Sequence, residues 1–270
     1  MLLYFSVKMK QLEKDLTVAS LHGELRTKLI GQNILYYPVT SSTMDVAKQA
    51  VREGAEEGTI VIADHQTAGR GRFGRRWWAP AESSILLSII LRPDLEQLPR
   101  LNMAAALAVV HSIEKVTGLR PVIKWPNDVL IEGKKVSGAL IESDVGDETV
   151  NSAILGIGLN VNLDPSSIPE ILETATSLRE VLKEEVSRLE MLRSLLGEFE
   201  ELYSALRQGE PIDKLWRHRL ETLGKRVTVR CGEMVQEGYA ESVDDEGNLL
   251  LRRPDGSLVT IVAGDVTLQV

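Results

Sequence analysis

The chain has little cysteine, no cluster of histidines and no excess of positive charge, and each shortage removes a class of protein. Cys231 is the one cysteine among 270 residues, so an internal disulfide is excluded and a reducing compartment is favoured. The four histidines are scattered and lack the spacing of a zinc site. The formal net charge of −8 argues against a general nucleic-acid coat, because phosphate binding depends on clustered Lys and Arg.

Apolar runs long enough to cross a bilayer are also missing. The longest candidate, residues 103–113, is short and contains His111. Near the N-terminus, Lys8 and Lys10 follow the apolar residues, whereas a cleavable signal places its charge first. We therefore expect a cytoplasmic protein with no membrane segment. Its hydrophobic content of 43% supports a sizeable core, and its length fits one large domain and one small one.

Through about residue 222, apolar runs of strand length alternate with segments of helical spacing, which predicts a mixed α/β domain. One helix is expected to begin at Ser41-Ser42-Thr43 as its capping segment, and another to stop at Gly118. The expected strands are 34–39, 59–66, 84–91, 122–125, 129–131, 136–142 and 153–161. The expected helices are 18–29, 43–54, 101–117, 187–206 and 212–220.

The pattern changes at about residue 223, where short β-like runs follow one another with turn signals between them. This predicts a small separate β-barrel. Residues 225–270 hold eight acidic residues against five basic ones, which favours a structural or partner-docking role over nucleic-acid binding. The runs are 227–229, 235–240, 249–251, 258–262 and 266–270.

One segment is more informative than any other: residues 65–78, HQTAGRGRFGRRWW, which follow an expected buried strand. It contains three glycines and four arginines. Glycines let a backbone wrap closely around a ligand, and arginines offer planar, permanently charged donors for phosphate and carboxylate. The segment therefore predicts a binding loop for a small anion.

Two other interpretations of this loop are weaker. Its glycines fit the dinucleotide-binding pattern G-x-G-x-x-G, but that fingerprint needs a helix to begin there. Trp77, Trp78 and Pro80 follow instead, with no helical pattern. Arginine-rich segments are also typical of nucleic-acid patches, an interpretation that the acidic balance of the whole chain disfavours.

Three further segments carry candidate chemistry, and each has a plain structural alternative. KWPND, residues 124–128, is either a ligand contact or a simple exit from a strand. KKVSG, residues 134–138, places two lysines at a strand mouth, a pattern that usually marks a solvated hairpin. In GIGLNVN, residues 156–162, glycines inside a strand indicate close approach of a ligand or of another part of the backbone, or packing against a helix.

Together with Ser42 and Thr43, these motifs resemble the biotin–protein ligases in order and approximate spacing, from about residue 34 to the C-terminus. The resemblance implies that biotin and ATP form biotinyl-5′-AMP and pyrophosphate, after which a carrier lysine displaces AMP. It implies an α/β (α+β) fold: a mixed β-sheet catalytic domain packed with helices, related to class II aminoacyl-tRNA synthetase and lipoate ligase folds, plus a C-terminal SH3-like β-barrel. The implied units are a short extension at 1–33, a catalytic domain at 34–222 and the barrel at 223–270.

The resemblance also implies roles for individual residues. Cations suit this chemistry, because they offset the repulsion between a carboxylate and a triphosphate. The implied catalytic residues are Lys135, Arg70 and Arg72. The implied biotin-binding residues are Ser42, Thr43, Met44, Gln66, Arg70, Gly71, Arg72, Lys135 and Gly138. The implied ATP- or adenylate-binding residues are Arg70, Arg72, Arg75, Trp77, Lys124, Asn127, Lys135 and Asn160. Mg²⁺ is implied with ATP, held mostly by phosphate and water, and Asp128 would contact either this ion or the incoming carrier lysine.

The chain departs from the family pattern in places. Met44 stands where asparagine is frequent, so a backbone contact is expected there in place of a side-chain hydrogen bond. Glu82-Ser83-Ser84 replaces a commoner glycine–asparagine pair, which puts nearby nucleotide contacts in question. Some members carry an N-terminal helix-turn-helix domain and act as repressors. Because only 33 residues precede the first expected catalytic strand, we expect a ligase without repressor activity or specific DNA binding.

The implied partner is a biotin carboxyl carrier protein of acetyl-CoA carboxylase or a related carboxylase, and a homodimer is expected. Three rival functions stay open at this point. A lipoate ligase shares the architecture and one essential lysine, although the GRGR and KWPND motifs favour biotin. A DNA-binding regulator that senses a nucleotide and a non-catalytic binding module are the other two.

Overall fold

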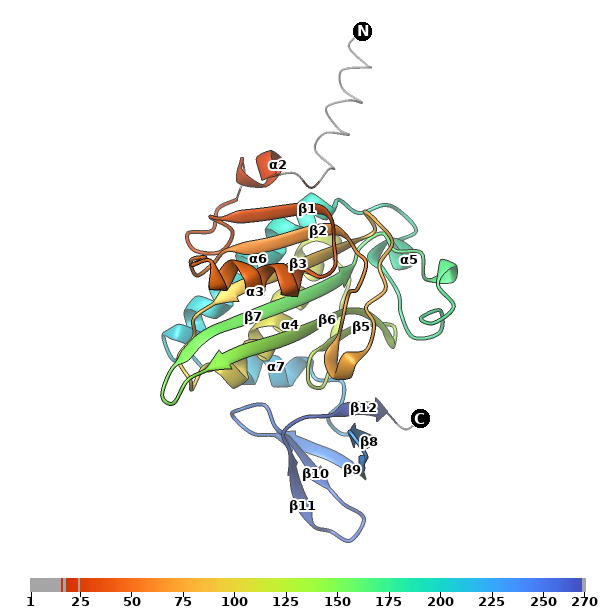
Figure 1. Ribbon diagram of the computed structural model, residues 1–270. Helices are drawn as coiled ribbons and strands as arrows, with labels where there is room; N and C mark the ends of the chain where they lie inside the picture. The colour runs from red at the N-terminus through yellow and green to blue at the C-terminus, as the bar shows by residue number, and fades with distance from the viewer. Residues whose placement is uncertain (1–15, 17, 24, 269–270) are drawn as a thin grey trace.

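The computed structural model describes residues 16, 18–23 and 25–268. Its main body is a seven-stranded sheet with the spatial order β1-β2-β3-β7-β6-β5-β4 (Figure 1). β1 runs parallel to β2, and the other neighbours are antiparallel. The strands are β1 (Ile34–Thr40), β2 (Ile60–Gln66), β3 (Ser84–Leu91), β4 (Val122–Lys124), β5 (Asp128–Ile131), β6 (Lys134–Val145) and β7 (Val150–Asn160).

Helices cover both faces of this sheet. α3 (Thr43–Arg52) packs on one face against β2, β3 and β7, and α4 (Leu101–Thr117) and α6 (Arg188–Arg207) pack together on the other face (Figure 1). Consequently every residue of the central strand β3 is buried, and its sequence is apolar on both faces except for Ser84 and Ser88. The predicted mixed α/β fold is therefore confirmed.

Local signals in the sequence predicted several helix boundaries correctly. The Ser42 side chain accepts a hydrogen bond from the backbone N–H of Met44 and caps α3, and Gly118 ends α4 in the left-handed conformation. α6 and α7 (Asp213–Arg219) match the two helices expected at 187–206 and 212–220. The sequence did not predict α5 (Leu178–Leu182), which is short and capped by Ser177.

The helix expected over 18–29 is wrong in length. α2 (Val18–His22) ends before Gly23, and the following residues are not helical. The backbone N–H groups of Lys28, Leu29 and Ile30 donate instead to the Glu200 carboxylate on α6, at 2.7, 2.7 and 2.8 Å. A side chain about 170 residues away thus satisfies the backbone donors that a longer helix would have used.

The C-terminal residues form a five-stranded antiparallel sheet with the order β11-β10-β9-β8-β12, which confirms the predicted β-structure. The last expected run, 266–270, extends past the described residues, which end at 268. The strands are β8 (Arg226–Cys231), β9 (Met234–Val243), β10 (Leu249–Arg252), β11 (Leu258–Ile261) and β12 (Asp265–Leu268).

This C-terminal sheet packs closely on the main body, and the two share one apolar core. Trp125 Nε1 donates to the Gly247 carbonyl at 2.8 Å, and a Cβ at Gly247 would lie 2.6 Å from Met103 Cε. The expectation of a separate barrel therefore misses an interface that reaches Trp125 in the KWPND motif. Within the described ranges, no helix has both the length and the apolar character needed to cross a membrane.

Candidate active site

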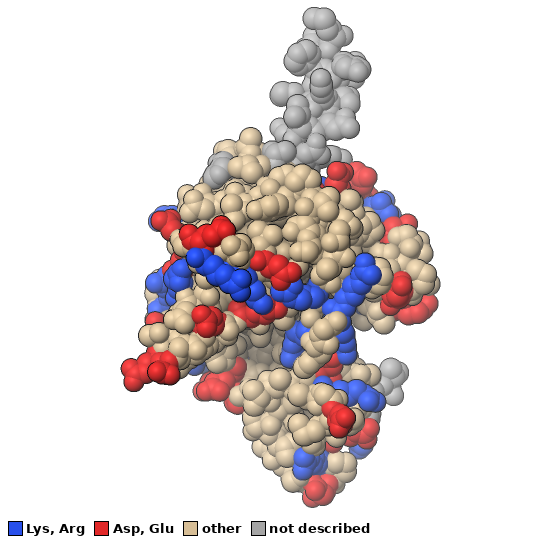
Figure 2. Space-filling model, viewed as in Figure 1, with Lys and Arg blue, Asp and Glu red and all other residues tan. Residues whose placement is uncertain are grey.

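A pocket of about 580 Å³ lies where the loop after β2 meets α3, β5, β6, β7 and β12. On the face in Figure 2, Lys and Arg gather in a band between the main body and the C-terminal sheet. The pocket brings together all fifteen residues to which the sequence assigned ligand contacts. They are Ser42, Thr43, Met44, Gln66, Arg70, Gly71, Arg72, Arg75, Trp77, Lys124, Asn127, Asp128, Lys135, Gly138 and Asn160.

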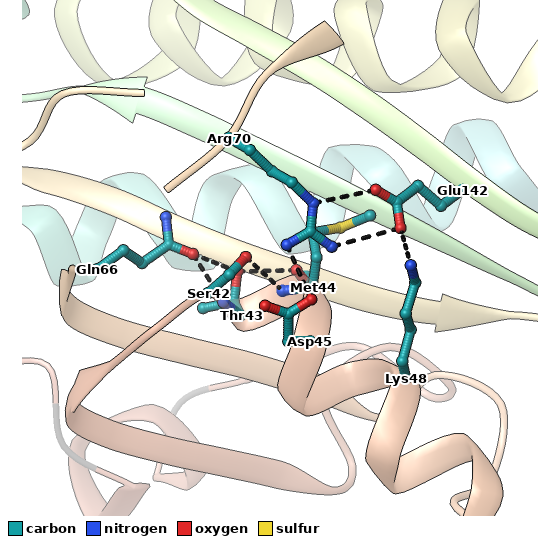
Figure 3. A network of polar contacts seen from close by, with 9 residues as sticks. Ser42, Thr43, Met44, Asp45, Lys48, Gln66, Arg70 and Glu142 are labelled. Atoms are coloured by element: carbon teal, nitrogen blue, oxygen red, sulfur yellow. Dashed lines mark hydrogen bonds and ion pairs between the residues drawn. The ribbon is translucent and has the colours of Figure 1, made fainter. Parts of the chain in front are cut away.

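One end of the pocket is polar and uncharged. Gln66 Oε1 at the end of β2 accepts from Thr43 N at 2.7 Å and from Thr43 Oγ1 at 3.1 Å. Ser88 Oγ on β3 donates to Thr43 Oγ1 at 2.8 Å. These bonds orient the Gln66 amide so that its NH₂ points away from α3 (Figure 3). This arrangement suits a neutral ligand that accepts and donates hydrogen bonds.

The glycines of GIGLNVN make room for side chains that form the walls of the pocket. A Cβ at Gly156 would lie 2.7 Å from Met44 Sδ, and a Cβ at Gly158 would lie 2.5 Å from Trp77 Cε2. Such distances are too short for any other residue without displacement of Met44 or the indole. Of the interpretations left open for this motif, packing against a helix holds at Gly156, which meets Met44 of α3, whereas Gly158 is approached by the side chain of Trp77.

Lys135 is held in a fixed position at the centre of the pocket. Its Nζ lies 2.6 Å from Asp128 Oδ1 and 5.5 Å from the centroid of the Trp77 ring. A Cβ at Gly138 would lie 2.9 Å from the same nitrogen, so only glycine leaves the ammonium this space. Lys124 Nζ lies 3.4 Å from Asp128 Oδ2. A single carboxylate thus lies between two lysines.

The backbone of Lys135 is restrained as well. Its N–H donates to the Thr174 carbonyl at 2.8 Å, and its carbonyl accepts from Thr176 N at 2.9 Å. Lys134, by contrast, is exposed at the tight turn between β5 and β6. The solvated-hairpin interpretation of KKVSG therefore holds for the first lysine and not for the second.

The glycine–arginine loop, which lies within residues 65–78, contacts both the main body and the C-terminal sheet. Arg72 Nη1 donates to Asn127 Oδ1 at 3.1 Å and to the Gly264 carbonyl at 3.3 Å. Burial lowers the pKa of Arg72 below its ordinary value, while the carboxylates of Asp265 and Asp128 oppose that shift. Arg75 forms an ion pair with Asp265 at the start of β12. The sequence analysis missed these C-terminal contacts, because no local motif marks a pair about 190 residues apart.

Two buried polar atoms beside the pocket have no partner among the described residues. Asn160 donates through Nδ2 to the Thr176 carbonyl at 3.0 Å, but its Oδ1 accepts nothing. Trp77 Nε1 likewise donates to nothing. An unsatisfied buried group costs about 1–3 kcal/mol, so each atom calls for a further partner, either ordered water or a ligand in the pocket.

Comparisons with known proteins identify this architecture. Residues 36–160 match the Biotin/lipoate A/B protein ligase family, and residues 222–268 match the Biotin protein ligase C terminal domain. The fold and the site thus define a ligase of the biotin/lipoate class. The chain is 39% identical over 249 residues to the Bifunctional ligase/repressor BirA of Bacillus subtilis (strain 168), covering 90% of this chain and 76% of that protein.

Further relatives narrow the assignment. The Biotin--[acetyl-CoA-carboxylase] ligase of Mycobacterium tuberculosis is 36% identical over 234 residues, covering 84% of this chain and 85% of that protein. A solved structure of the biotin protein ligase from Aquifex aeolicus, in complex with biotin and ATP, superposes with a TM-score of 0.74 at 28% identity, covering 88% of this chain and 99% of that one. The chain belongs to the biotin protein ligase family.

Proposed function

We propose that this enzyme uses ATP to attach biotin to one lysine of a biotin carboxyl carrier protein, with biotinyl-5′-AMP as the intermediate. The observation that carries the proposal is the place of the Lys135 ammonium. It lies in the same pocket as the uncharged polar end at Thr43 and Gln66 and beside the Trp77 ring. The solved structure of the relative from Aquifex aeolicus, which is a complex with biotin and ATP, supports this pairing of ligands.

The polar end fits the ureido ring of biotin, which donates through two N–H groups and accepts through one carbonyl. Ser42, Thr43 and Gln66 supply the matching groups in this proposal. Met44 contributes its buried thioether as an apolar wall, since its backbone N–H already donates to Ser42 Oγ at 3.3 Å. Gly138 leaves space for the Lys135 ammonium beside the ligand, and Gly71 lines the pocket.

The other end fits an adenylate. The unsatisfied Oδ1 of Asn160 is an acceptor suited to the amino group of adenine, which guanine replaces with a carbonyl. Trp77 offers a face for stacking, and its Nε1–H, which has no partner among the described residues, is a donor. Arg72 and Asn127 lie together at the mouth of this end, where a phosphate would gain charge-assisted hydrogen bonds. Lys124 and Arg75 add charge at its margin.

The proposed chemistry has two steps. An oxygen of the biotin carboxylate attacks the α-phosphorus of ATP, a new P–O bond forms, and pyrophosphate leaves with the electrons of the broken anhydride bond. Lys135 offsets the repulsion between the two anions and stabilises charge that builds on the α-phosphate. The neutral amine of a carrier lysine then attacks the acyl carbon, AMP leaves, and the nitrogen loses a proton as the amide forms.

Magnesium fits this site as an ion carried by the nucleotide. The described residues contain no group of three His, Cys, Asp or Glu side chains arranged to hold a metal. Asp128 is the nearest candidate to the reacting groups, and it already contacts Lys124 and Lys135. Magnesium would neutralise the leaving pyrophosphate, with phosphate and water as its main ligands. Asp128 remains a candidate for either this ion or the carrier lysine.

Pyrophosphate release tests the proposal directly. The purified chain with ATP and biotin should release pyrophosphate, and omission of biotin should abolish the signal. Lipoate in place of biotin separates the two branches of the matched family, because a lipoate ligase would respond to lipoate alone. Absence of release with biotin, or equal release with lipoate, would refute the proposed activity.

The geometry of the pocket bears on the ligase activity. It does not bear on repressor activity, specific DNA binding or dimerisation. Relatives such as the Bacillus subtilis protein carry the name ligase/repressor, so the expectation of no repressor activity needs its own test. A gel shift with genomic fragments, with and without biotin and ATP, should show no specific complex. Sedimentation under the same conditions tests the expected homodimer.

A further inference from the structure

Arg70 is engaged by two carboxylates on one side of the loop. Its Nε and Nη2 donate to the two oxygens of Glu142 at 3.1 and 3.4 Å, and its Nη1 lies 2.8 Å from Asp45 Oδ1 (Figure 3). Lys48 Nζ lies 2.5 Å from the second Glu142 oxygen. Two acidic and two basic groups thus form one chain of contacts, in the order Lys48, Glu142, Arg70 and Asp45.

The charges in this network stabilise one another. Burial alone would lower the pKa of Arg70, but the hydrogen bonds and charges of Glu142 and Asp45 raise it above its ordinary value. Burial would also raise the pKa of Glu142, but Arg70 and Lys48 hold it below its usual range. Arg70 and Glu142 therefore stay ionised at neutral pH, and the bonds between them are charge-assisted.

The network joins three elements that meet at the biotin end of the pocket. Arg70 comes from the loop, Asp45 from the first turn of α3, and Glu142 from β6. Asp45 follows Thr43 by two residues, so the loop is tied to the helical turn proposed to hold the ureido ring. The other loop arginines, Arg72 and Arg75, contact the far side at Asn127 and the C-terminal sheet.

We propose that Glu142 and Asp45 are positioning residues that fix Arg70, and that Arg70 anchors the first part of the loop beside bound biotin in place of contacting the α-phosphate. This inference rests on the proposed ligase function. The loop backbone carries the restraint onward, because Gly71 N donates to the Arg75 carbonyl at 2.7 Å and Trp77 N donates to the Gly69 carbonyl at 2.9 Å. Loss of the anchor would release the cover over biotin and leave Lys135 and Arg72 in place.

Glu142→Gln tests the anchor, because glutamine keeps the shape of the side chain and removes its charge. Biotin should dissociate about tenfold faster, and KM for biotin should rise, while kcat at saturating biotin changes by less than about threefold. A hundredfold effect is not expected, because Asp45 and Lys48 are about half exposed (51% and 45%) and water screens their charges. Trypsin should also cut faster within residues 70–76.

Two further variants separate the anchor from a general loss of structure. Asp45→Asn removes the second carboxylate on an exposed side chain and should give the same signature. Lys48→Ala is the matched control, because it removes a partner of Glu142 that does not touch the loop. It should leave the biotin dissociation rate and the trypsin pattern unchanged.

Removal of Arg70 itself discriminates an anchor from a direct phosphate contact. Arg70→Ala should release biotin rapidly even without nucleotide, and Arg70→Ala/Glu142→Gln should release it no faster than Arg70→Ala, because the carboxylate acts only through Arg70. If Arg70 instead binds the phosphate, Arg70→Ala leaves biotin release in the absence of nucleotide unchanged. That result, or wild-type biotin release by Glu142→Gln and Asp45→Asn, would overturn the inference. A wild-type protein without biotin-dependent pyrophosphate release would instead refute the proposed function itself.

Discussion

The Nζ of Lys135 lies 2.6 Å from Oδ1 of Asp128, and this contact places the ammonium in the centre of the pocket. Lys124 shares the same carboxylate at 3.4 Å, so the charge of Asp128 is balanced from two sides. A carboxylate or phosphate that enters the pocket can therefore form an ion pair with the Lys135 ammonium without a large movement of the lysine side chain. In the proposed mechanism, Lys135 acts from this prepared position.

Lys135→Ala should lower the rate of adenylate formation by about 10²–10³, the usual cost of losing one preorganised donor at a developing charge. The exposed neighbour offers a control: Lys134→Ala should retain the wild-type rate. The measurement is biotin-dependent pyrophosphate release at saturating ATP. A loss smaller than about threefold in Lys135→Ala would remove this residue from the chemistry.

Arg72→Gly should weaken retention of the adenylate more than its formation, because the guanidinium lies beside Asn127 at the phosphate end. Dissociation of the isolated adenylate from the variant should be at least about tenfold faster than from the wild type. Arg76→Ala serves as the comparison, since Arg76 stacks on Trp78 at 3.9 Å from the ring centroid. Equal release from wild type and Arg72→Gly would exclude a clamp.

Gly156→Ala should raise KM for biotin, because the new methyl group would lie 2.7 Å from Met44 Sδ and push the thioether into the pocket. The double variant Gly156→Ala/Met44→Ala removes the clash and should recover affinity to the level of Met44→Ala alone. Gly197→Ala is the control at a glycine with open space around it. A methyl group there meets no other atom within 4 Å, so the substitution should stabilise α6 by about 0.5–1 kcal/mol. Biotin affinity unchanged in Gly156→Ala would contradict this packing.

Stability should fall in strongly alkaline solution partly because of Tyr36. Burial, followed by the hydrogen bond and charge of Asp64, raises the pKa of Tyr36 from 10.0 to about 12. The unfolded chain therefore loses this proton before the folded one, and the contribution to stability is present below pH 10 and declines up to pH 12. Urea unfolding should show a smaller decline for Tyr36→Phe than for wild type over this window. Parallel declines would mean that the hydroxyl titrates normally.

Local signals in the sequence predicted much of the fold. The Ser42 cap, the Gly118 stop and the period of the apolar residues each act within one or two turns of a helix, so they can be read without the structure. The resemblance of the motifs to the biotin–protein ligases also identified the residues that line the pocket. Their individual roles remain predictions.

Long-range contacts could not be predicted in this way. Glu200 caps the backbone of residues 28–30, and Asp265 pairs with Arg75, although nothing near any of these residues marks its partner. The same holds for Glu142, an ordinary acidic residue of β6 until the fold places it against Arg70. Tertiary packing decides such pairs, and a local pattern carries no information about them.

A single-turnover experiment tests the central claim most directly. The protein is incubated with biotin and ATP labelled in the α-phosphate, freed of small molecules, and then mixed with a biotin carboxyl carrier domain without further ATP. We predict that the labelled adenylate stays with the protein, and that the carrier then becomes biotinylated on one lysine as an equal amount of labelled AMP is released. Retention of unreacted ATP, or biotin transfer without stoichiometric AMP, would contradict the proposed intermediate.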